Sequence, residues 1–287
     1  MRFPRNIYLR KELLSFPIST FFGLVVCAAL TVSCTALPGG GAGSADGQSV
    51  VATQAQEAAQ DNTDLRRRAK IRLELAVNYF QQKQIKTALD ESRQAIAIDP
   101  AYADAYSLRA IMLSEIGESR EAEAEFKQAL RLAPQDSDIN NSYGWFLCQN
   151  SREKEAISYF VAAARNPLYE TPGKPLQNAG ICSMRMKDYP TAETFLIRAF
   201  EVEPASVVAI YNLALLYLRM NDFERATFYS ERLNKMIEPS AESLWLAIRI
   251  AHKKGDRQEK DRWATQLRRK FLSSREWSAY QRGAFDD

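Results

Sequence analysis

Cysteine is the residue type in this chain whose placement suggests chemistry. The sequence of 287 residues contains Cys27, Cys34, Cys148 and Cys182, and a single histidine, His252. A thiol can be acylated, oxidised to a disulfide or used as a metal ligand. One histidine cannot form a histidine cluster for a metal, and no catalytic triad is suggested around it. We therefore expect the cysteines to serve attachment and cross-linking, and we expect no enzymatic activity.

Cys34 follows a segment with the composition of an export signal. A basic stretch that ends at Lys11 precedes an apolar run that ends at Ser33. This run falls short of the roughly 20 residues of a membrane span, so residues 1–33 are expected to be a cleaved signal peptide. The small Ser33 directly before Cys34 resembles the lipobox of bacterial lipoproteins, although Thr31 stands where Leu is usual. We predict that Cys34 is lipidated, with an uncleaved anchor or an ordinary signal as the alternatives.

The residues after Cys34 predict where the chain is attached. Thr35 stands where many lipoproteins retained in the inner membrane carry Asp, which favours the outer membrane. Most residues from there to Thr63 are Gly, Ala, Ser, Gln or Asp, and such a composition buries little apolar surface. We expect residues 34–63 to form a lipidated N-terminus and flexible tether. Residues 64–287 are then a folded domain that faces the periplasm.

The charge of the chain argues against several classes of ligand. Four of the 38 basic residues and one of the 35 acidic residues lie in the first 33 positions, so the chain that follows is formally neutral. A neutral body offers no broad field for a phosphate backbone, and we expect no nucleic-acid partner. The glycines at positions 39–41 lack the Lys and the helix of a phosphate-binding loop. We expect neither a cofactor nor a small-molecule substrate.

A period of 34 residues organises the chain from about residue 69 onward. Alanine recurs at this spacing, as in Ala88, Ala122 and Ala156 and in Ala95, Ala129 and Ala163, and the pattern resumes after a two-residue insertion. Six units therefore begin near residues 69, 103, 137, 173, 207 and 241. Small residues at matching positions let two antiparallel helices approach to about 8–10 Å. The pattern resembles the tetratricopeptide repeat (TPR) rather than a plain helical bundle, and it predicts an all-α, right-handed superhelical solenoid of about six TPR helix-turn-helix units.

The first helices of a TPR solenoid build a concave wall that binds segments of partner proteins. The expected wall is aromatic and aliphatic, with amide and basic groups, and consists of Leu73, Val77, Phe80, Ile111, Asn141, Trp145, Gln149, Gln177, Ile181, Arg185, Tyr211, Leu215 and Arg219. Trp145 and Tyr211 are the expected anchors, because large aromatic side chains often dominate binding. The alternative is that either ring packs only between neighbouring helices. The wall lacks the Lys and Asn of a carboxylate clamp, which argues against a chaperone adaptor.

Cys148 and Cys182 fall late in the first helices of the third and fourth units. These two helices are expected to be parallel neighbours, so the thiols lie at matching heights. An even pair of cysteines in an exported chain favours a disulfide. Its loop of about 34 residues would contribute roughly 3–4 kcal/mol in the chain-entropy model. Two buried free thiols are the alternative.

Several sequence blocks are more specific than the repeat itself. They are residues 140–148 (NNSYGWFLC), the insertion at 166–169 with 171–172, residues 178–182 (NAGIC), and the tail at 274–276 with 280–285. The blocks resemble the PilF/PilW family of type IV pilus biogenesis lipoproteins, and the resemblance covers nearly the whole chain from Arg66 onward. It implies an outer-membrane pilotin that helps the secretin PilQ reach that membrane and form its multimeric channel. The alternative is a TPR lipoprotein that scaffolds other envelope machinery, such as peptidoglycan enzymes.

Overall fold

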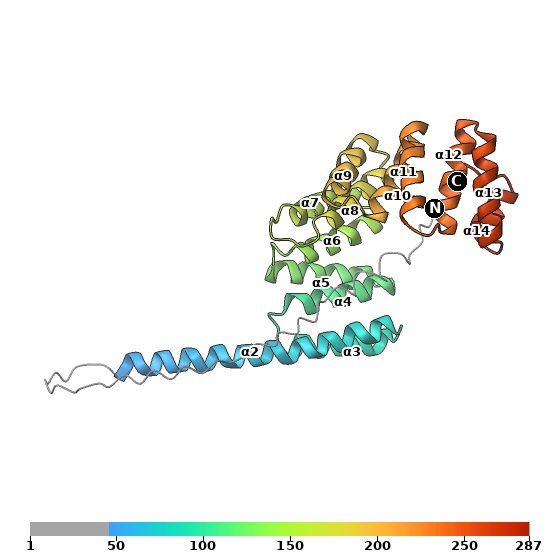
Figure 1. Cartoon of the computed structure of the whole chain (residues 1–287). Coiled ribbons are helices and arrows are strands. Elements are labelled where there is room, and N and C mark those ends of the chain that lie inside the picture. Colours follow the sequence, from blue (N-terminus) through green and yellow to red (C-terminus); the bar gives the residue numbers. More distant parts are fainter. Residues whose placement is uncertain (1–45, 287) are drawn as a thin grey trace, which may run out of the picture. The chain divides into compact units, whose positions relative to one another are not determined.

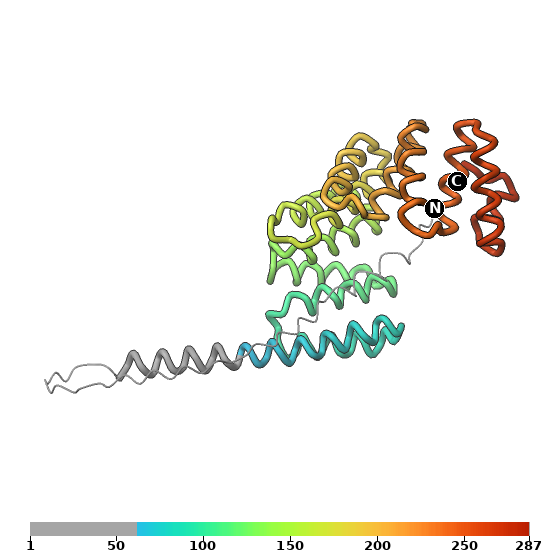
Figure 2. The backbone as a smooth tube through the Cα atoms, viewed as in Figure 1, coloured from blue at the N-terminus to red at the C-terminus, as the bar shows by residue number. Residues whose placement is uncertain are grey.

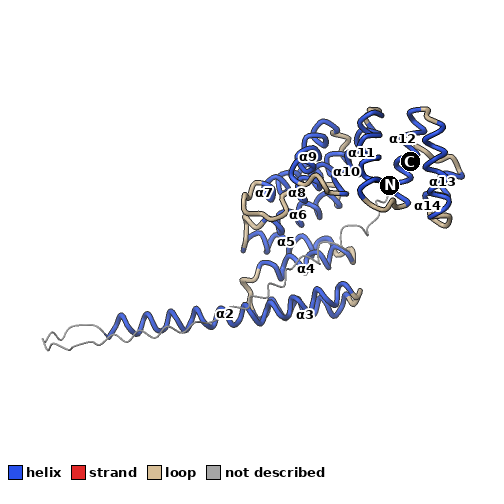
Figure 3. The backbone as a smooth tube through the Cα atoms, viewed as in Figure 1, coloured by secondary structure: helices blue, strands red, loops and turns tan. Residues whose placement is uncertain are grey.

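The computed structural model describes the backbone of residues 46–286 and the side chains from Asn62 onward. The described range contains helices, turns and loops and no strand (Figure 3). It divides after Pro100 into an N-terminal part and a C-terminal part, each compact. The helices are α2 (Asp46–Gln81) and α3 (Ile85–Ile98) in the N-terminal part, followed by α4 (Ala103–Glu115), α5 (Ser119–Leu132), α6 (Ser137–Gln149), α7 (Glu153–Ala164), α8 (Gly173–Arg185), α9 (Tyr189–Val202), α10 (Val207–Arg219), α11 (Phe223–Met236), α12 (Ala241–Lys254), α13 (Arg257–Lys270) and α14 (Arg275–Gln281).

The N-terminal part is a helix pair in which α2 packs against α3. Arg72 donates to Glu91 at 3.0 Å, and Arg66 pairs with Asp99, so ion pairs join the two helices. The prediction of a flexible tether up to Thr63 is wrong for residues 46–63, because α2 begins at Asp46. Ala and Gln are frequent there and are good helix formers, so a segment with little apolar surface can still extend an existing helix. The predicted signal peptide and Cys34 lie outside the described residues.

The C-terminal part repeats the same helix pair. Five predicted starts coincide with the first residues of α4, α6, α8, α10 and α12, which are Ala103, Ser137, Gly173, Val207 and Ala241. Each first helix packs against its second helix, and first helices of successive pairs also touch one another, as α4 touches α6 and α10 touches α12. The stacking can be followed from α4 to α13 (Figure 1, Figure 2). The predicted fold class of an all-helical TPR solenoid is confirmed.

A left-handed residue closes the first helix of every pair. The six residues are Lys83, Gly117, Ser151, Lys187, Asn221 and Gly255, with φ between 59° and 89°. In each case the next residue donates its N–H to the carbonyl five residues earlier, at 2.9–3.0 Å. This hydrogen bond is the one that ends a helix in a Schellman motif. The turn therefore recurs with the repeat, although only two of the six residues are glycine.

Small residues at the eighth position of a repeat are required by the packing. A Cβ atom on Gly180 would lie 2.5 Å from Cγ of Leu196, and one on Gly144 would lie 2.8 Å from the ring of Phe160. Glycine thus brings the backbone of a first helix directly onto the side chains of its second helix. Between residues 46 and 286, no helix has both the length and the apolar character that crossing a membrane requires.

Candidate protein-binding surface

The wall predicted from the sequence lies on first helices, and its residues differ widely in exposure. Buried members are Leu73, Phe80, Asn141, Gln177, Ile181 and Leu215, half-buried members are Val77, Ile111, Trp145, Arg185, Tyr211 and Arg219, and Gln149 is exposed. Leu73, Val77 and Phe80 belong to the N-terminal part, and the others belong to the C-terminal part. Within the C-terminal part, contacts between successive first helices bring the wall residues of neighbouring repeats together.

Two of the three amide residues of the wall, Asn141 and Gln177, hold repeats together. Oδ1 of Asn141 accepts a hydrogen bond of 2.9 Å from Nδ2 of Asn178, which joins α6 to α8. Nε2 of Gln177 donates at 2.8 Å to the hydroxyl of Ser206, the residue that caps α10. Asn141 and Gln177 each keep only 5% of their surface exposed. The expectation that these amides face a partner is therefore wrong, because buried polar groups of this kind are satisfied by neighbouring helices.

The disulfide predicted between Cys148 and Cys182 is present and joins α6 to α8. The two Cα atoms lie 5.9 Å apart, within the ordinary range for a disulfide, and both cysteines are fully buried. Nε of Arg185, predicted as a wall residue, lies 3.4 Å from a carboxylate oxygen of Glu153 at the start of α7. The side chains of α8 thus brace the third and fourth repeats against each other.

The aromatic residues of the wall keep part of their surface exposed. Trp145 on α6 is half-buried. Tyr211 on α10 is half-buried and packs against the core cluster that contains Leu213 and Tyr217. Burial raises the pKa of the Tyr211 hydroxyl, and the charges of Arg249 and Glu242 on the next first helix act on it as well. Tyr211 therefore serves the core and contributes to a surface that continues onto α12.

The C-terminal tail covers the wall of the sixth repeat, which the sequence analysis did not predict. The ring of Phe285 lies 4.0 Å from the ring of His252 and 5.6 Å from that of Trp245, measured between centroids. Nε of Arg249 donates to the carbonyl of Phe285 at 3.0 Å. Tyr280 and Phe285, aromatic residues beyond the last helix pair, are the sequence signal that could have indicated such a contact.

The charged groups on the second helices form structural ion pairs. Lys127 and Arg152 lie 2.7 Å and 2.9 Å from a carboxylate oxygen of Glu123, and the hydroxyl of Tyr143 donates to it at 3.2 Å. Hydrogen bonds from Lys127 and then Arg152 lower the pKa of Glu123 to about 2. In the fifth repeat, Tyr217 and Arg225 hold Glu193 in the same way. Such a pattern links neighbouring repeats.

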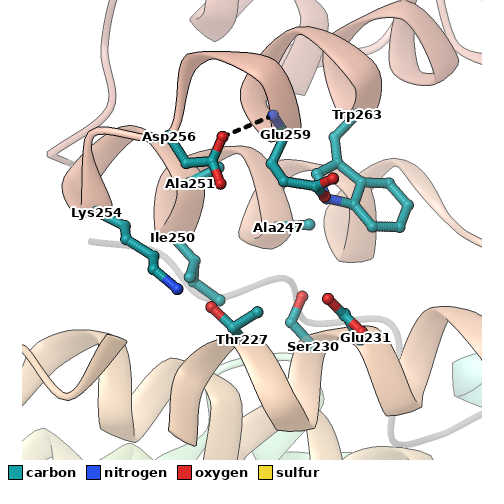
Figure 4. A pocket seen from close by; sticks show the side chains of 10 residues that line it. All are labelled: Thr227, Ser230, Glu231, Ala247, Ile250, Ala251, Lys254, Asp256, Glu259 and Trp263. Atoms are coloured by element: carbon teal, nitrogen blue, oxygen red, sulfur yellow. Dashed lines mark hydrogen bonds between the residues drawn. The ribbon is translucent and has the colours of Figure 1, made fainter. Parts of the chain in front are cut away.

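A pocket of about 40 Å³ opens between α11, α12 and α13 (Figure 4). Its lining includes the hydroxyl of Ser230, which is buried and has no hydrogen-bond partner among the described residues. Asp256 on its rim accepts the N–H of Glu259 at 3.0 Å, which caps α13. The volume suits one or two water molecules rather than a metabolite.

The chain matches known TPR proteins over most of its folded length. Residues 47–172 and residues 207–238 match family models described as tetratricopeptide repeat. A curated relative, the type IV pilus assembly protein PilF of Pseudomonas aeruginosa, is 26% identical over 209 residues, which cover 73% of this chain and 83% of that protein.

Solved structures of similar sequence have the same fold. The crystal structure of PilW, described as a widely conserved type IV pilus biogenesis factor, has a TM-score of 0.70 and 29% identity, and the match covers 74% of this chain and 98% of PilW. The structure of P. aeruginosa PilF has a TM-score of 0.66 and 25% identity, with coverage of 77% and 99%. Both matches span nearly all of the relative.

Proposed function

Because the chain belongs to the PilF/PilW family of TPR proteins of type IV pilus biogenesis, we propose that it acts as a pilotin. In this role a lipid on Cys34 holds the protein at the outer membrane, where it binds the pilus secretin, PilQ, and promotes assembly of the secretin multimer. The observation that carries the proposal is the match to the solved structures of PilW and PilF, which covers 98% and 99% of those two proteins.

The exposed part of the wall suits a protein ligand. Ile111, Trp145 and Tyr211 offer aliphatic and aromatic surface on three first helices, and Arg219 adds a positive charge. Aromatic side chains that keep a partly exposed face are the usual anchors of protein interfaces. TPR walls of this kind take extended or helical segments of a partner. We therefore place the secretin segment on this wall, with Trp145 and Tyr211 as its main contacts.

The mechanism that follows is a local increase in concentration. A lipid chain confines the protein to one membrane, and each bound secretin subunit is then confined to the same surface. Confinement raises the effective concentration of subunits for one another, which favours the multimer without a new contact between them.

Lipidation at Cys34 is tested by labelled palmitate, which we expect to be incorporated by the parent chain. Label that survives the Cys34→Ser substitution would contradict lipidation at this residue.

Secretin binding is tested by isolating the tagged protein from detergent-solubilised outer membranes. We expect the secretin to copurify with the parent protein, and we expect Trp145→Ala to reduce the recovered secretin about tenfold, as for the loss of one anchor residue. Phe228→Ala is a matched control, because Phe228 is an aromatic residue that is 58% exposed on a second helix. Recovery of peptidoglycan enzymes without secretin would contradict the proposal.

A further inference from the structure

The last described residues of the chain turn back onto the first helix of the sixth repeat. Helix α14 contacts α12 and α13 (Figure 1). It ends at Gln281, and Gly283, two residues further on, has a φ of +68°. The N–H of Ala284 donates to the carbonyl of Ala279 at 3.0 Å. This is the same left-handed helix end that closes every first helix. It directs Phe285 and Asp286 across the wall of α12.

Phe285 and Asp286 make three kinds of contact with α12. The ring of Phe285 stacks on His252 and Trp245 at interplanar angles of 23° and 28°. The main-chain carbonyl of Phe285 accepts from Nε of Arg249 at 3.0 Å, and the carboxylate of Asp286 pairs with Nζ of Lys253. An aromatic side chain, a backbone carbonyl and a carboxylate are thus each recognised by a different residue of one helix. These are the elements by which a groove recognises a peptide.

The contacts lie on the face of α12 that corresponds to the partner-binding wall. Trp245 occupies the fifth position of its repeat, as Tyr211 does in the preceding repeat, and Arg249 occupies the ninth position, as Leu215 does. Arg249 and Lys253 give this face two positive charges. The tail supplies aromatic and acidic groups to it, so Asp286 meets the positive Lys253 and the ring of Phe285 meets the rings of the helix.

We propose that this face of α12 is a binding site for a peptide segment in which an aromatic residue precedes an acidic one, and that the chain's own tail occupies it until a partner segment displaces it. Trp277 and Tyr280 of α14 pack against the core cluster of the sixth repeat, which contains Leu244 and Leu267, and the ring of Phe285 adjoins the same cluster. Removal of the tail takes the ring of Phe285 from this cluster and keeps α14, with Trp277 and Tyr280, in the chain. Asp286 remains largely exposed, with 81% of its side-chain surface accessible, as expected for a segment that can leave.

Competition between tail and partner sets the affinity of the site. A segment joined to its site by a short linker has an effective concentration on the order of millimolar. If the tail as a free peptide binds the open site with a dissociation constant of about 100 µM, a partner segment binds the occupied site about tenfold more weakly than the open site. The tail thus restricts the site to partners that are locally concentrated or that make further contacts with the wall. The proposal holds for any such segment and does not depend on the secretin being the partner.

The test uses a fluorescent peptide with the sequence of residues 281–287 (QRGAFDD) as its probe. Fluorescence anisotropy is measured with the parent protein and with a chain that ends at Gly283. We expect the shortened chain to bind about tenfold more tightly than the parent, because the tail no longer competes. A peptide with Phe285→Ala should bind the shortened chain at least about tenfold more weakly than the parent peptide.

Two substitutions in the shortened chain separate the site from general effects of charge. Arg249→Ala removes the group that binds the carbonyl of Phe285, and we expect about a tenfold loss of peptide affinity. Arg257→Ala is the matched control, because Arg257 is an exposed arginine at the start of α13. Equal loss with both substitutions, or equal affinity of the shortened and parent chains, would overturn the proposal.

A second variant guards against misfolding of the shortened chain. Phe285→Ala in the full chain should raise affinity for the parent peptide while the far-ultraviolet circular dichroism remains that of the parent and thermal unfolding remains cooperative. If both variants lose helix or cooperative melting, the tail is a structural part of the sixth repeat and the proposal is overturned. Peptide binding by either folded variant that is insensitive to the Phe285→Ala change in the peptide would overturn it too.

Discussion

The third and fourth repeats and the sixth repeat use the same wall positions in opposite ways. At the fifth position, Asn141 and Gln177 are buried and bind neighbouring helices, and a disulfide joins the same two first helices. In the sixth repeat, Trp245 at the fifth position and Arg249 at the ninth position contact a short peptide, the tail of the chain. The repeat pattern therefore determines the position of a side chain on its helix. Whether that side chain stabilises the solenoid or binds a ligand depends on the group that it contacts.

The largest expected difference between the two regions concerns the disulfide. Replacing Cys148 and Cys182 by Ala should lower the free energy of unfolding by roughly 3–4 kcal/mol, because the unfolded chain is no longer constrained by the loop. Denaturant unfolding of the parent with and without reductant measures the same effect, and the double variant should not respond to reductant. Peptide binding at α12 should remain unchanged. If the parent and the double variant had the same free energy of unfolding, the disulfide would not stabilise the third and fourth repeats.

Loss of the hydrogen bond between Asn141 and Asn178 should cause the next largest decrease in the free energy of unfolding. Asn178→Ala leaves Oδ1 of Asn141 without its donor, and an unsatisfied buried polar group costs about 1–3 kcal/mol. Chemical denaturation measures the loss. The double variant with Asn141→Ala should lose less than the sum of the two single losses, because the two residues share one interaction. Strict additivity would show that the pair does not couple α6 to α8.

The tail should contribute much less to the free energy of unfolding than the contacts between the third and fourth repeats do. We expect Phe285→Ala to lower the free energy of unfolding by about 1 kcal/mol or less, since it removes ring contacts at a half-buried position. Hydrogen exchange should show faster exchange in α14 and unchanged exchange in α6 and α8. A loss as large as that of the disulfide would place the tail among the structural elements and erase the contrast between the two regions.

The smallest effect is the pH dependence of stability that Glu123 of the second repeat contributes through its contacts with the third repeat. Its pKa is lowered from 4.5 to about 2 in the folded protein, so the folded state favours the charged form. The resulting stabilisation is present above about pH 4.5 and is lost as the pH falls towards 2. Because the carboxylate is partly exposed, we expect about 0.5–1 kcal/mol. Glu123→Gln should flatten the stability profile in this window, measured by denaturant unfolding at pH 5.5 and pH 3. An unchanged profile would contradict the ion pairs with Lys127 and Arg152.

The fold could be predicted from the sequence more completely than the surface could. Spacing of Ala and Gly located the start of α4, α6, α8, α10 and α12, since close helix contacts demand small residues at fixed intervals. The same spacing gave the position of the disulfide. The spacing could not predict the hydrogen-bond partner of Asn141. Asn178 lies 37 residues further along the chain, and the packing of α6 against α8 brings the two side chains together.

Two further features escaped prediction for related reasons. Composition suggested a tether before Thr63, but helix propensity and the helix that follows extend α2 back to Asp46. The tail has no repeat period, so nothing in its spacing indicated that Phe285 would meet Trp245 and His252. Periodicity predicts where the helices begin and end, whereas the contacts of single side chains depend on neighbours that are distant in sequence.

The central claim is that the chain promotes assembly of the pilus secretin at the outer membrane. The most direct test compares secretin multimers that resist sodium dodecyl sulfate in a strain that lacks the gene, in the parent strain and in a strain complemented with the gene. We expect the multimers to fall sharply without the gene, to be restored by the parent gene, and to be restored poorly by the Trp145→Ala form. Multimers at the parent level in the strain without the gene would contradict the claim.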